Sequence, residues 1–137
     1  MPRTEITKNW SIDIDADFER RVEEGDLMLH KPGRTIYAAV YSTNNLDAEQ
    51  AITKMLEGRP GRPTETFDRA EPDLSGYAYL LPEITGNHSY WGLNTWTAIK
   101  GSVACVTIYF DAETDLQWAL ATWRSIQFGE GKKTLLN

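Results

Sequence analysis

The chain of 137 residues has the length of one domain, residues 1–137, of which 129–137 are expected to form a frayed tail. Hydrophobic residues make up 41% and charged residues 25%, which is typical of a soluble globular protein. The formal net charge of −6 argues against a nucleic-acid-binding protein, which needs a dense positive field, and against docking on anionic membranes.

The N-terminal third of the chain predicts three strands. Apolar and polar residues alternate over residues 10–14, which is the pattern of a strand with one buried face. Charged residues dominate Phe18–Glu24, where we expect a turn or a short helical loop. Asp26–Lys31 and Thr35–Ser42 are the second and third strands, separated by the turn signal Pro32-Gly33. These three strands are expected to form a meander.

A helix is predicted over Asn44–Glu57. Asp47 is a good N-cap, and Gln50 stands three residues later at the reciprocal position of a capping box. Apolar side chains recur along one face of this segment at helical spacing. The Gly/Pro-rich run 58–63 that follows cannot continue a helix or pair as an inner strand, so it is expected to be an exposed loop.

The second half of the chain predicts further strands. Thr64–Ala70 and Gly76–Leu81 are strand candidates, and Pro82–His88 is expected to be a loop. Two aromatic-rich strands follow, Ser89–Ile99 and Ser102–Phe110. In the second of them both faces are largely apolar, which is typical of a central strand that is covered on both sides.

The chain is expected to end in a helix over Asp111–Ile126 with an apolar stripe that faces the core. Trp118 falls on the opposite side of this helix. We expect it either to be covered by another part of the chain, since tryptophan is highly buried on average, or to contact a partner, since tryptophan is enriched in interface hot spots. Together these elements predict an α+β fold, with an antiparallel sheet of about six to seven strands flanked by two helices.

The element order is accompanied by four short patterns: Trp10-Ser11-Ile12, Gly33-Arg34-Thr35-Ile36, Tyr109-Phe110-Asp111 and Trp123-Arg124-Ser125-Ile126. In the order of its expected elements and in these four patterns, the chain resembles the Mog1/PsbP-like fold, including its bacterial DcrB-type branch. The resemblance implies an α/β/α sandwich of order βββαββββα and a mostly non-enzymatic role. Members of the family bind a small GTPase, photosystem subunits or, as chaperones of bacterial type VI secretion, secreted toxin effectors.

The resemblance transfers no functional residue to this chain, because each pattern belongs to the framework of the fold. The chain also departs from the DcrB and PsbP branches, since its first residues show neither a signal nor a lipoprotein segment. We therefore expect a cytoplasmic protein.

No cofactor or metal site is expected. His30 and His88 are the only histidines and Cys105 is the only cysteine, and their spacing is not that of a zinc site. A Gly-x-Ser-x-Gly nucleophile elbow and a phosphate-binding glycine loop are also absent from the sequence. The alternative function is an enzyme or small-molecule-binding protein with a pocket beside the sheet, in which His30 or His88 works with a nearby acid.

Three acidic residues, Glu71, Asp73 and Glu83, flank the Gly76–Leu81 strand. A pair of carboxylates is able to run acid–base chemistry, but loop acids beside a strand are far more often solvated. We therefore predict no catalytic residue among them.

Aromatic residues on the neighbouring strands indicate a binding surface. They are Tyr77, Tyr79, Tyr90, Trp91, Trp96 and Tyr109. Core filling explains most of them, yet an aromatic sheet face that is only partly covered makes a groove for an apolar peptide or helix. The expected binding residues are Tyr77, Tyr79, Trp91 and Trp96 on the sheet, Trp118 on the outer helix face, and Arg59 and Arg62.

The two arginines in the Gly/Pro loop are candidates for binding an acidic partner, although a solvated loop is the simpler interpretation. The sequence thus predicts a non-enzymatic protein-binding module, whose partner is another protein. An accessory chaperone or an immunity-type partner of a secreted bacterial effector is the most concrete version. A homodimer built through the outer sheet edge is a third expectation.

Overall fold

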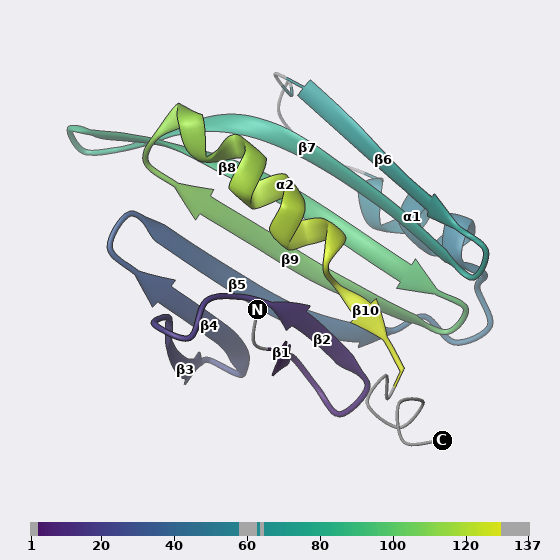
Figure 1. Cartoon of the computed structure of the whole chain (residues 1–137). Helices are drawn as coiled ribbons and strands as arrows, with labels where there is room; N and C mark the ends of the chain where they lie inside the picture. The colour runs from purple at the N-terminus through teal and green to yellow at the C-terminus, as the bar shows by residue number, and fades with distance from the viewer. Residues whose placement is uncertain (1–2, 58–62, 64, 130–137) are drawn as a thin grey trace.

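The computed structural model describes residues 3–57, 63 and 65–129 of the chain (Figure 1). The strands are β1 Arg3–Glu5, β2 Trp10–Asp13, β3 Glu19–Glu23, β4 Asp26–Lys31, β5 Arg34–Ser42, β6 Glu65–Glu71, β7 Leu74–Thr85, β8 His88–Ile99, β9 Ser102–Phe110 and β10 Gln127–Phe128. The helices are α1 Ala48–Leu56 and α2 Leu116–Arg124, and a 3-10 turn over Glu113–Asp115 precedes α2. The expected loop over 58–63 and the expected frayed tail lie outside the described residues, except for 63 and 129.

Seven of the strands form one antiparallel sheet in the order β3-β4-β5-β9-β8-β7-β6. The number of strands and the α+β class agree with the sequence prediction. The central strand is β9, which pairs with β5 on one side and with β8 on the other along its whole length. A second sheet, β1-β2-β10, brings segments from both ends of the described chain side by side and was not anticipated.

Two sequence predictions near the N-terminus are wrong. Within the segment Phe18–Glu24, residues Glu19–Glu23 form strand β3 rather than a turn or a helical loop, because pairing with β4 decides the conformation of a charged segment that has little preference of its own. The meander therefore consists of β3, β4 and β5. The strand that begins at Trp10 instead pairs with β1 and β10 in the small sheet.

The loop predicted over Pro82–His88 is also mostly strand. β7 continues to Thr85 and β8 begins at His88, so that only Gly86, with a φ of 62°, and Asn87 form the turn. Pro82 lies beyond Leu80, the residue opposite the first residue of β6, so no described strand pairs with Pro82 on that side. Proline cannot donate to a sheet hydrogen bond and is tolerated where a strand has a free edge.

Helix α2 covers one face of the large sheet through the apolar stripe that the sequence predicts. The Trp123 side chain in the last turn of α2 is 0% exposed, and its Nε1 donates a hydrogen bond to Thr97 Oγ1 at 3.0 Å. Gly76 makes room for the ring, since a Cβ atom there would lie 3.1 Å from Trp123 Cζ2. These contacts join α2 to β7 and β8.

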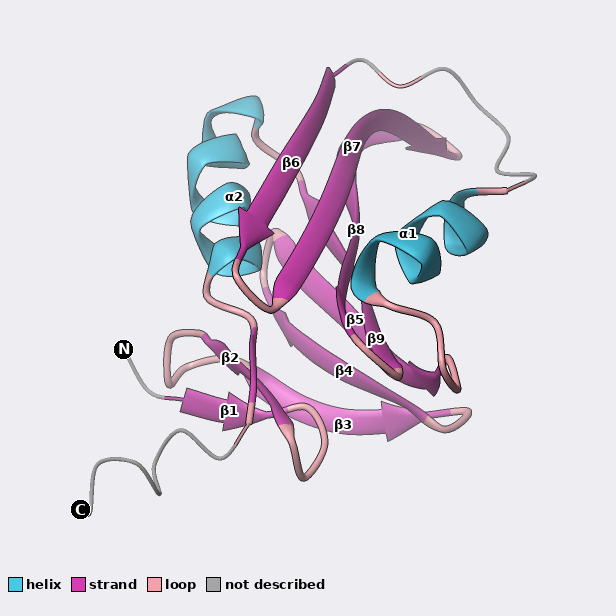
Figure 2. Cartoon of the chain, turned by 90° about the vertical axis from the view of Figure 1, so that its right-hand side faces the viewer, coloured by secondary structure: helices cyan, strands magenta, loops and turns pink. Residues whose placement is uncertain are grey.

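Helix α1 lies on the opposite face of the sheet, so that the two helices enclose it (Figure 2). Its capping box is formed as predicted: the Asp47 carboxylate accepts from the Gln50 backbone, and the Gln50 side chain accepts from the Asp47 backbone. The inner side of α1 buries Ala51 fully. Each of the two α-helices described has nine residues, which is too short to cross a membrane.

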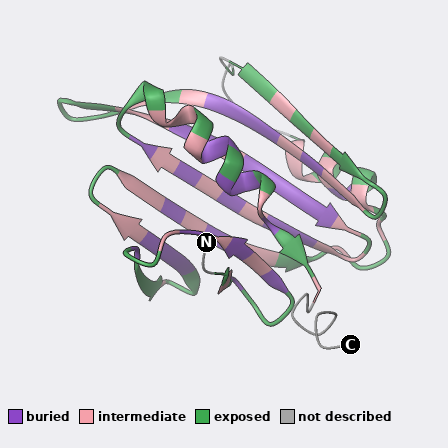
Figure 3. Ribbon diagram, in the orientation of Figure 1, coloured by how far each residue is buried: buried purple, intermediate pink, exposed green. Residues whose placement is uncertain are grey.

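The two faces of β9 are not equally covered, contrary to the expectation of a strand buried on both sides. Ala104, Val106, Ile108 and Phe110 point toward α2 and are at most 1% exposed. On the other face Val103 is buried, whereas the three following residues of the same face are half-buried: Cys105, Thr107 and Tyr109. Figure 3 shows this alternation of buried and intermediate positions along the central strands.

Trp118 is covered by another part of the chain, which was one of the two alternatives for this residue. Its ring stacks on Phe18 with the centroids 6.0 Å apart and the planes 9° from parallel. The guanidinium carbon of Arg34 lies 4.2 Å from the Trp118 ring centroid, and Arg34 also bonds to Asp115 with two nitrogen atoms, at 3.0 and 3.2 Å. This stack ties the loop before β3 to β5 and α2.

Replacement of Trp118 by alanine is expected to lower the free energy of unfolding by about 2 kcal/mol, less than the ~3–5 kcal/mol of a fully buried tryptophan. The loss follows from the removed contacts with Phe18 and Arg34. Urea denaturation measures it. The neighbouring change Gln117→Ala, at an exposed position of the same helix, should stay within about 0.5 kcal/mol. Equal effects of the two changes would contradict the packing role of Trp118.

Candidate functional site

The face of the large sheet that carries α1 is the candidate site. Residues paired across antiparallel strands point to the same side, so the register identifies the rows of this face. One row contains Ala39, Cys105, Trp96 and Tyr77, and the next contains Tyr37, Thr107, Asn94 and Tyr79. A third row contains Thr35, Tyr109, Gly92 and Leu81. We call this surface the α1-side face.

Helix α1 covers only the part of this face formed by β7, β8 and the start of β9. Tyr79 is 9% exposed and Trp96 4%, and both belong to the apolar cluster around Ala51, with Tyr77 packed against it. Three of the predicted binding residues are therefore packed against α1, and two of these are buried. Their aromatic side chains attach α1 to this part of the sheet.

The remaining predicted binding residues lie elsewhere. Trp91 is paired with Phe110 and faces the α2 side, where it packs at the margin of the main core. Trp118 is half-buried in its stack with Phe18. Arg59 and Arg62 lie outside the described residues. The structure thus does not bring the predicted set together into one surface.

The uncovered part of the α1-side face carries a different group of aromatic residues, which we call the tyrosine row: Tyr37 on β5, Tyr109 on β9 and Tyr90 on β8. Tyr37 and Tyr109 meet edge to face at 6.1 Å, and Tyr109 and Tyr90 at 5.6 Å. All three are half-buried. Sequence reasoning included Tyr90 and Tyr109 in the aromatic surface, but missed Tyr37, whose signal was its alternation with the buried Ile36 and Ala38.

A hollow of about 610 Å³ lies beside the tyrosine row. Its floor is formed by the sheet, with Tyr37, Thr107 and Cys105 among the lining residues, and Met55 of α1 stands at one side. Tyr41, which is 51% exposed, also lines it. The hollow lies on the part of the α1-side face that α1, which packs on β7, β8 and β9, leaves uncovered.

Glu83 and Tyr109 lie together over Gly92. A Cβ atom on Gly92 would stand 3.1 Å from Tyr109 Cε1 and 3.4 Å from Glu83 Oε2, so the missing side chain leaves room for both groups. Burial raises the pKa of Tyr109, and the negative charge of Glu83 raises it further, followed by smaller contributions from Tyr90 and Tyr37. The Tyr109 phenol is therefore held in its neutral form, next to a carboxylate.

Both histidines are paired with carboxylates at the surface. His88 Nε2 lies 3.1 Å from Asp111 Oδ1, with both side chains more than half exposed, and its ring stacks on Tyr90 at 5.3 Å. His30 Nε2 lies 3.4 Å from Glu19 Oε1, and the Glu19 side chain is 79% exposed. Neither histidine lines a hollow described here, so the geometry does not form the enclosed acid–base pair that the alternative function requires.

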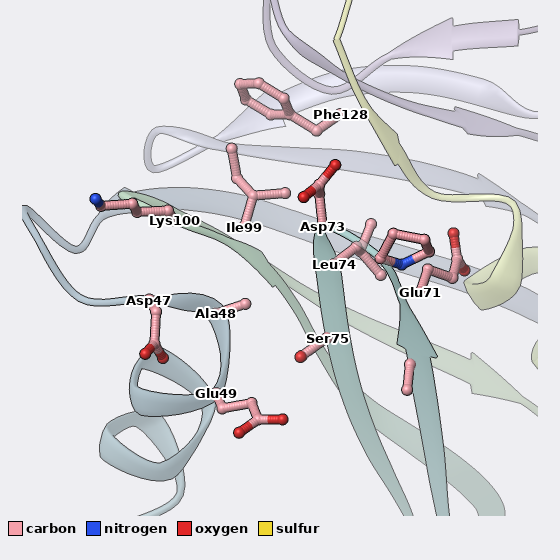
Figure 4. A pocket seen from close by; sticks show the side chains of 12 residues that line it. Asp47, Ala48, Glu49, Glu71, Asp73, Leu74, Ser75, Ile99, Lys100 and Phe128 are labelled. Carbon is pink, nitrogen blue, oxygen red and sulfur yellow. The ribbon is translucent and has the colours of Figure 1, made fainter.

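A larger open hollow of about 880 Å³ lies between the start of α1 and the β6–β7 turn (Figure 4). Four carboxylates line it, but two are engaged: Asp47 caps α1, and Glu71 bonds to Arg69 Nε at 2.6 Å. Figure 4 shows the Glu49 and Asp73 side chains well apart. Within the described residues no group of three or more potential ligands is arranged to hold a metal ion.

Comparison with known proteins adds the fold only. No family model matches the chain, and no curated protein matches it. The chain is similar to a crystal structure of a protein from Bacteroides thetaiotaomicron VPI-5482, with a TM-score of 0.73 and 11% sequence identity over 94% of this chain. This chain spans 49% of that protein's chain, about half of its length. At such low identity the similarity establishes a shared fold.

Replacement of Glu83 by glutamine is expected to lower the pKa of Tyr109, because the carboxylate charge that opposes ionisation of the phenol is removed. Tyrosinate absorbance during an alkaline titration measures the change, with Tyr109→Phe identifying the signal. A raised pKa of Tyr109 in the folded state stabilises the fold below the ordinary tyrosine pKa of about 10, and this contribution is lost as the pH rises through the folded-state pKa.

The matched control is Glu49→Gln, which removes the same charge from an exposed residue of α1 on the same side of the sheet. It should leave the Tyr109 titration where it is in the unchanged protein. An identical titration of Tyr109 with and without the Glu83 carboxylate would contradict the contact described over Gly92.

Proposed function

We propose that this chain is a non-enzymatic protein-binding module and that it binds its partner through the tyrosine row and the adjacent hollow. The observation that carries the proposal is the incomplete cover of the α1-side face, which leaves three half-buried tyrosines and the more exposed Tyr41 beside the hollow. Tyrosine is enriched in interfaces because its ring buries a large apolar area at a low cost in side-chain entropy.

The charges around this surface favour a basic partner. Asp26 lines the hollow on the β4 side, and Glu83 lies beside Tyr109 on the β7 side. Neither carboxylate forms a hydrogen bond or an ion pair with another described residue. Complementary charge steers partners toward such a surface and raises the rate of association.

The most concrete version of the proposal is an accessory chaperone, or an immunity-type partner, of a secreted bacterial effector, acting in the cytoplasm. Support comes from the family resemblance of the sequence to Mog1/PsbP-like proteins. The arrangement of two helices around one antiparallel sheet also agrees with the sandwich that this resemblance implies.

The edges of the sheet offer less support for a homodimer. The edge strand β3 has the sequence Glu-Arg-Arg-Val-Glu, and the edge strand β6 has charged residues at four of its seven positions. Charged side chains on edge strands oppose pairing with a second copy. The aromatic face, rather than an edge, is therefore the surface we assign to the partner.

A photo-cross-linking residue, p-benzoylphenylalanine, tests this surface when placed at Tyr41. In cells that express the partner, it should give one discrete cross-linked species, which mass spectrometry then identifies. The same residue placed at Gln117, exposed on the α2 side, should give none. No adduct at Tyr41, or the same adduct at both positions, would count against the proposed surface.

The identified protein then allows a quantitative test with purified components. Tyr37→Ala is expected to weaken its binding at least tenfold, about 1.4 kcal/mol, as for a residue of an interface hot spot. Thr66→Ala, on the exposed edge strand β6 of the same sheet, should change the affinity less than twofold. Titration calorimetry measures both affinities.

A further inference from the structure

On the side opposite the tyrosine row, an aromatic ring and a carboxylate together hold an arginine. The guanidinium of Arg34 lies over the Trp118 ring at 4.2 Å and forms two hydrogen bonds with Asp115. The guanidinium thus makes a cation–π contact with the ring and a bidentate pair of hydrogen bonds with the carboxylate.

A second set of the same kind lies next to the first. Lys31 Nζ lies 5.4 Å from the Phe18 ring centroid and 2.7 Å from Asp17 Oδ2. The hydrogen bond with Lys31 lowers the pKa of Asp17, which shows that the cation stabilises the charged form of the carboxylate. In both sets the cation comes from the chain itself.

Tyr109 and Glu83 form a third set, but without a cation. The carboxylate and the Tyr109 ring both lie close over Gly92, and Tyr90, the cross-strand partner of Glu83, has its ring centroid 5.6 Å from that of Tyr109. In the described part of the chain Glu83 has no ion-pair partner. His88, whose ring stacks on Tyr90 at 5.3 Å, is hydrogen-bonded to Asp111.

A half-buried carboxylate beside an aromatic ring is poorly stabilised on its own. Its negative charge has lost part of its hydration. A cation placed against the carboxylate and the ring is attracted by both groups, as at Arg34 and Lys31. Glu83 and the two tyrosine rings therefore offer the charge and the aromatic surface for a cationic side chain from outside.

We propose that Glu83, Tyr109 and Tyr90 form the receptor for an arginine side chain of the partner protein. This inference rests on the proposed function and adds the chemistry of the residue that is recognised. Arginine fits better than lysine, because its flat guanidinium stacks on a ring and bonds to a carboxylate with two nitrogens, as Arg34 does.

The test uses the whole chain and the peptide Ac-Gly-Arg-Gly-NH2, titrated while the ring resonances of Tyr90 and Tyr109 are followed by NMR. The control peptide contains citrulline, the neutral analogue of arginine with nearly the same shape. The arginine peptide should shift both rings and bind at least fivefold more tightly than the citrulline peptide. A lysine peptide should bind more weakly than the arginine peptide.

Two variants locate the preference. Glu83→Gln should reduce the arginine-to-citrulline ratio below twofold, whereas Glu49→Gln, which removes the same charge from α1, should leave it unchanged. Near-ultraviolet circular dichroism verifies that each variant keeps its packing. Equal binding of the two peptides to the unchanged chain, an equal loss in both variants, or a lysine peptide that binds as well as the arginine peptide would overturn the proposal.

One rival occupant belongs to this chain. Arg62 precedes Glu65 by three residues, and Glu83 follows Leu80, the partner of Glu65, by three residues. If the arginine peptide binds only after the change Arg62→Ser, the receptor is filled from within and the proposal is overturned. These outcomes leave the cross-linking result at Tyr41 untouched, so failure of the arginine receptor and failure of the binding surface are distinguishable.

Discussion

The structure depends on the mismatch between a short helix and a wide sheet. A helix of nine residues is about 14 Å long and roughly 10 Å across, whereas seven strands spaced about 4.8 Å apart extend over roughly 29 Å. α1 is therefore able to bury only part of the face on which it lies. The other face is covered by α2 and by the small sheet β1-β2-β10, which together leave the main core closed.

This unequal cover explains the different tasks of the aromatic residues. Under α1, Tyr79 and Trp96 fill the space between helix and sheet and are buried. Away from α1, no helix or strand among the described residues packs on the tyrosines, which pack edge to face against one another. Aromatic residues under α1 thus serve packing, whereas the tyrosines of the same face that α1 does not cover remain accessible to a partner.

Much of the fold was predictable because its signals are local. The capping box at Asp47 and the apolar stripe of α2 depend on spacing within one element, and both appear in the structure as the sequence indicates. The binding residues were less predictable. Alternation along β7 and β8 tells which side chains share a face, but not how far a helix from another part of the chain reaches over that face, so the buried Tyr79 and Trp96 were taken for surface anchors. β3 was missed for a related reason, since its charged residues form a strand only when β4 lies beside them.

The sequence by itself determined the α+β class, the antiparallel sheet with a helix for each face, and the lack of zinc or phosphate-binding motifs, because periodicity, capping and motif spacing are properties of neighbouring residues. Only the tertiary structure decided which aromatic residues are covered, that Trp118 stacks on Phe18 and holds Arg34 over its ring, and that Glu83 and Tyr109 lie together over Gly92 without a described cation. These features join side chains that are far apart in the sequence, and their environment depends on the length and placement of elements that no local pattern records.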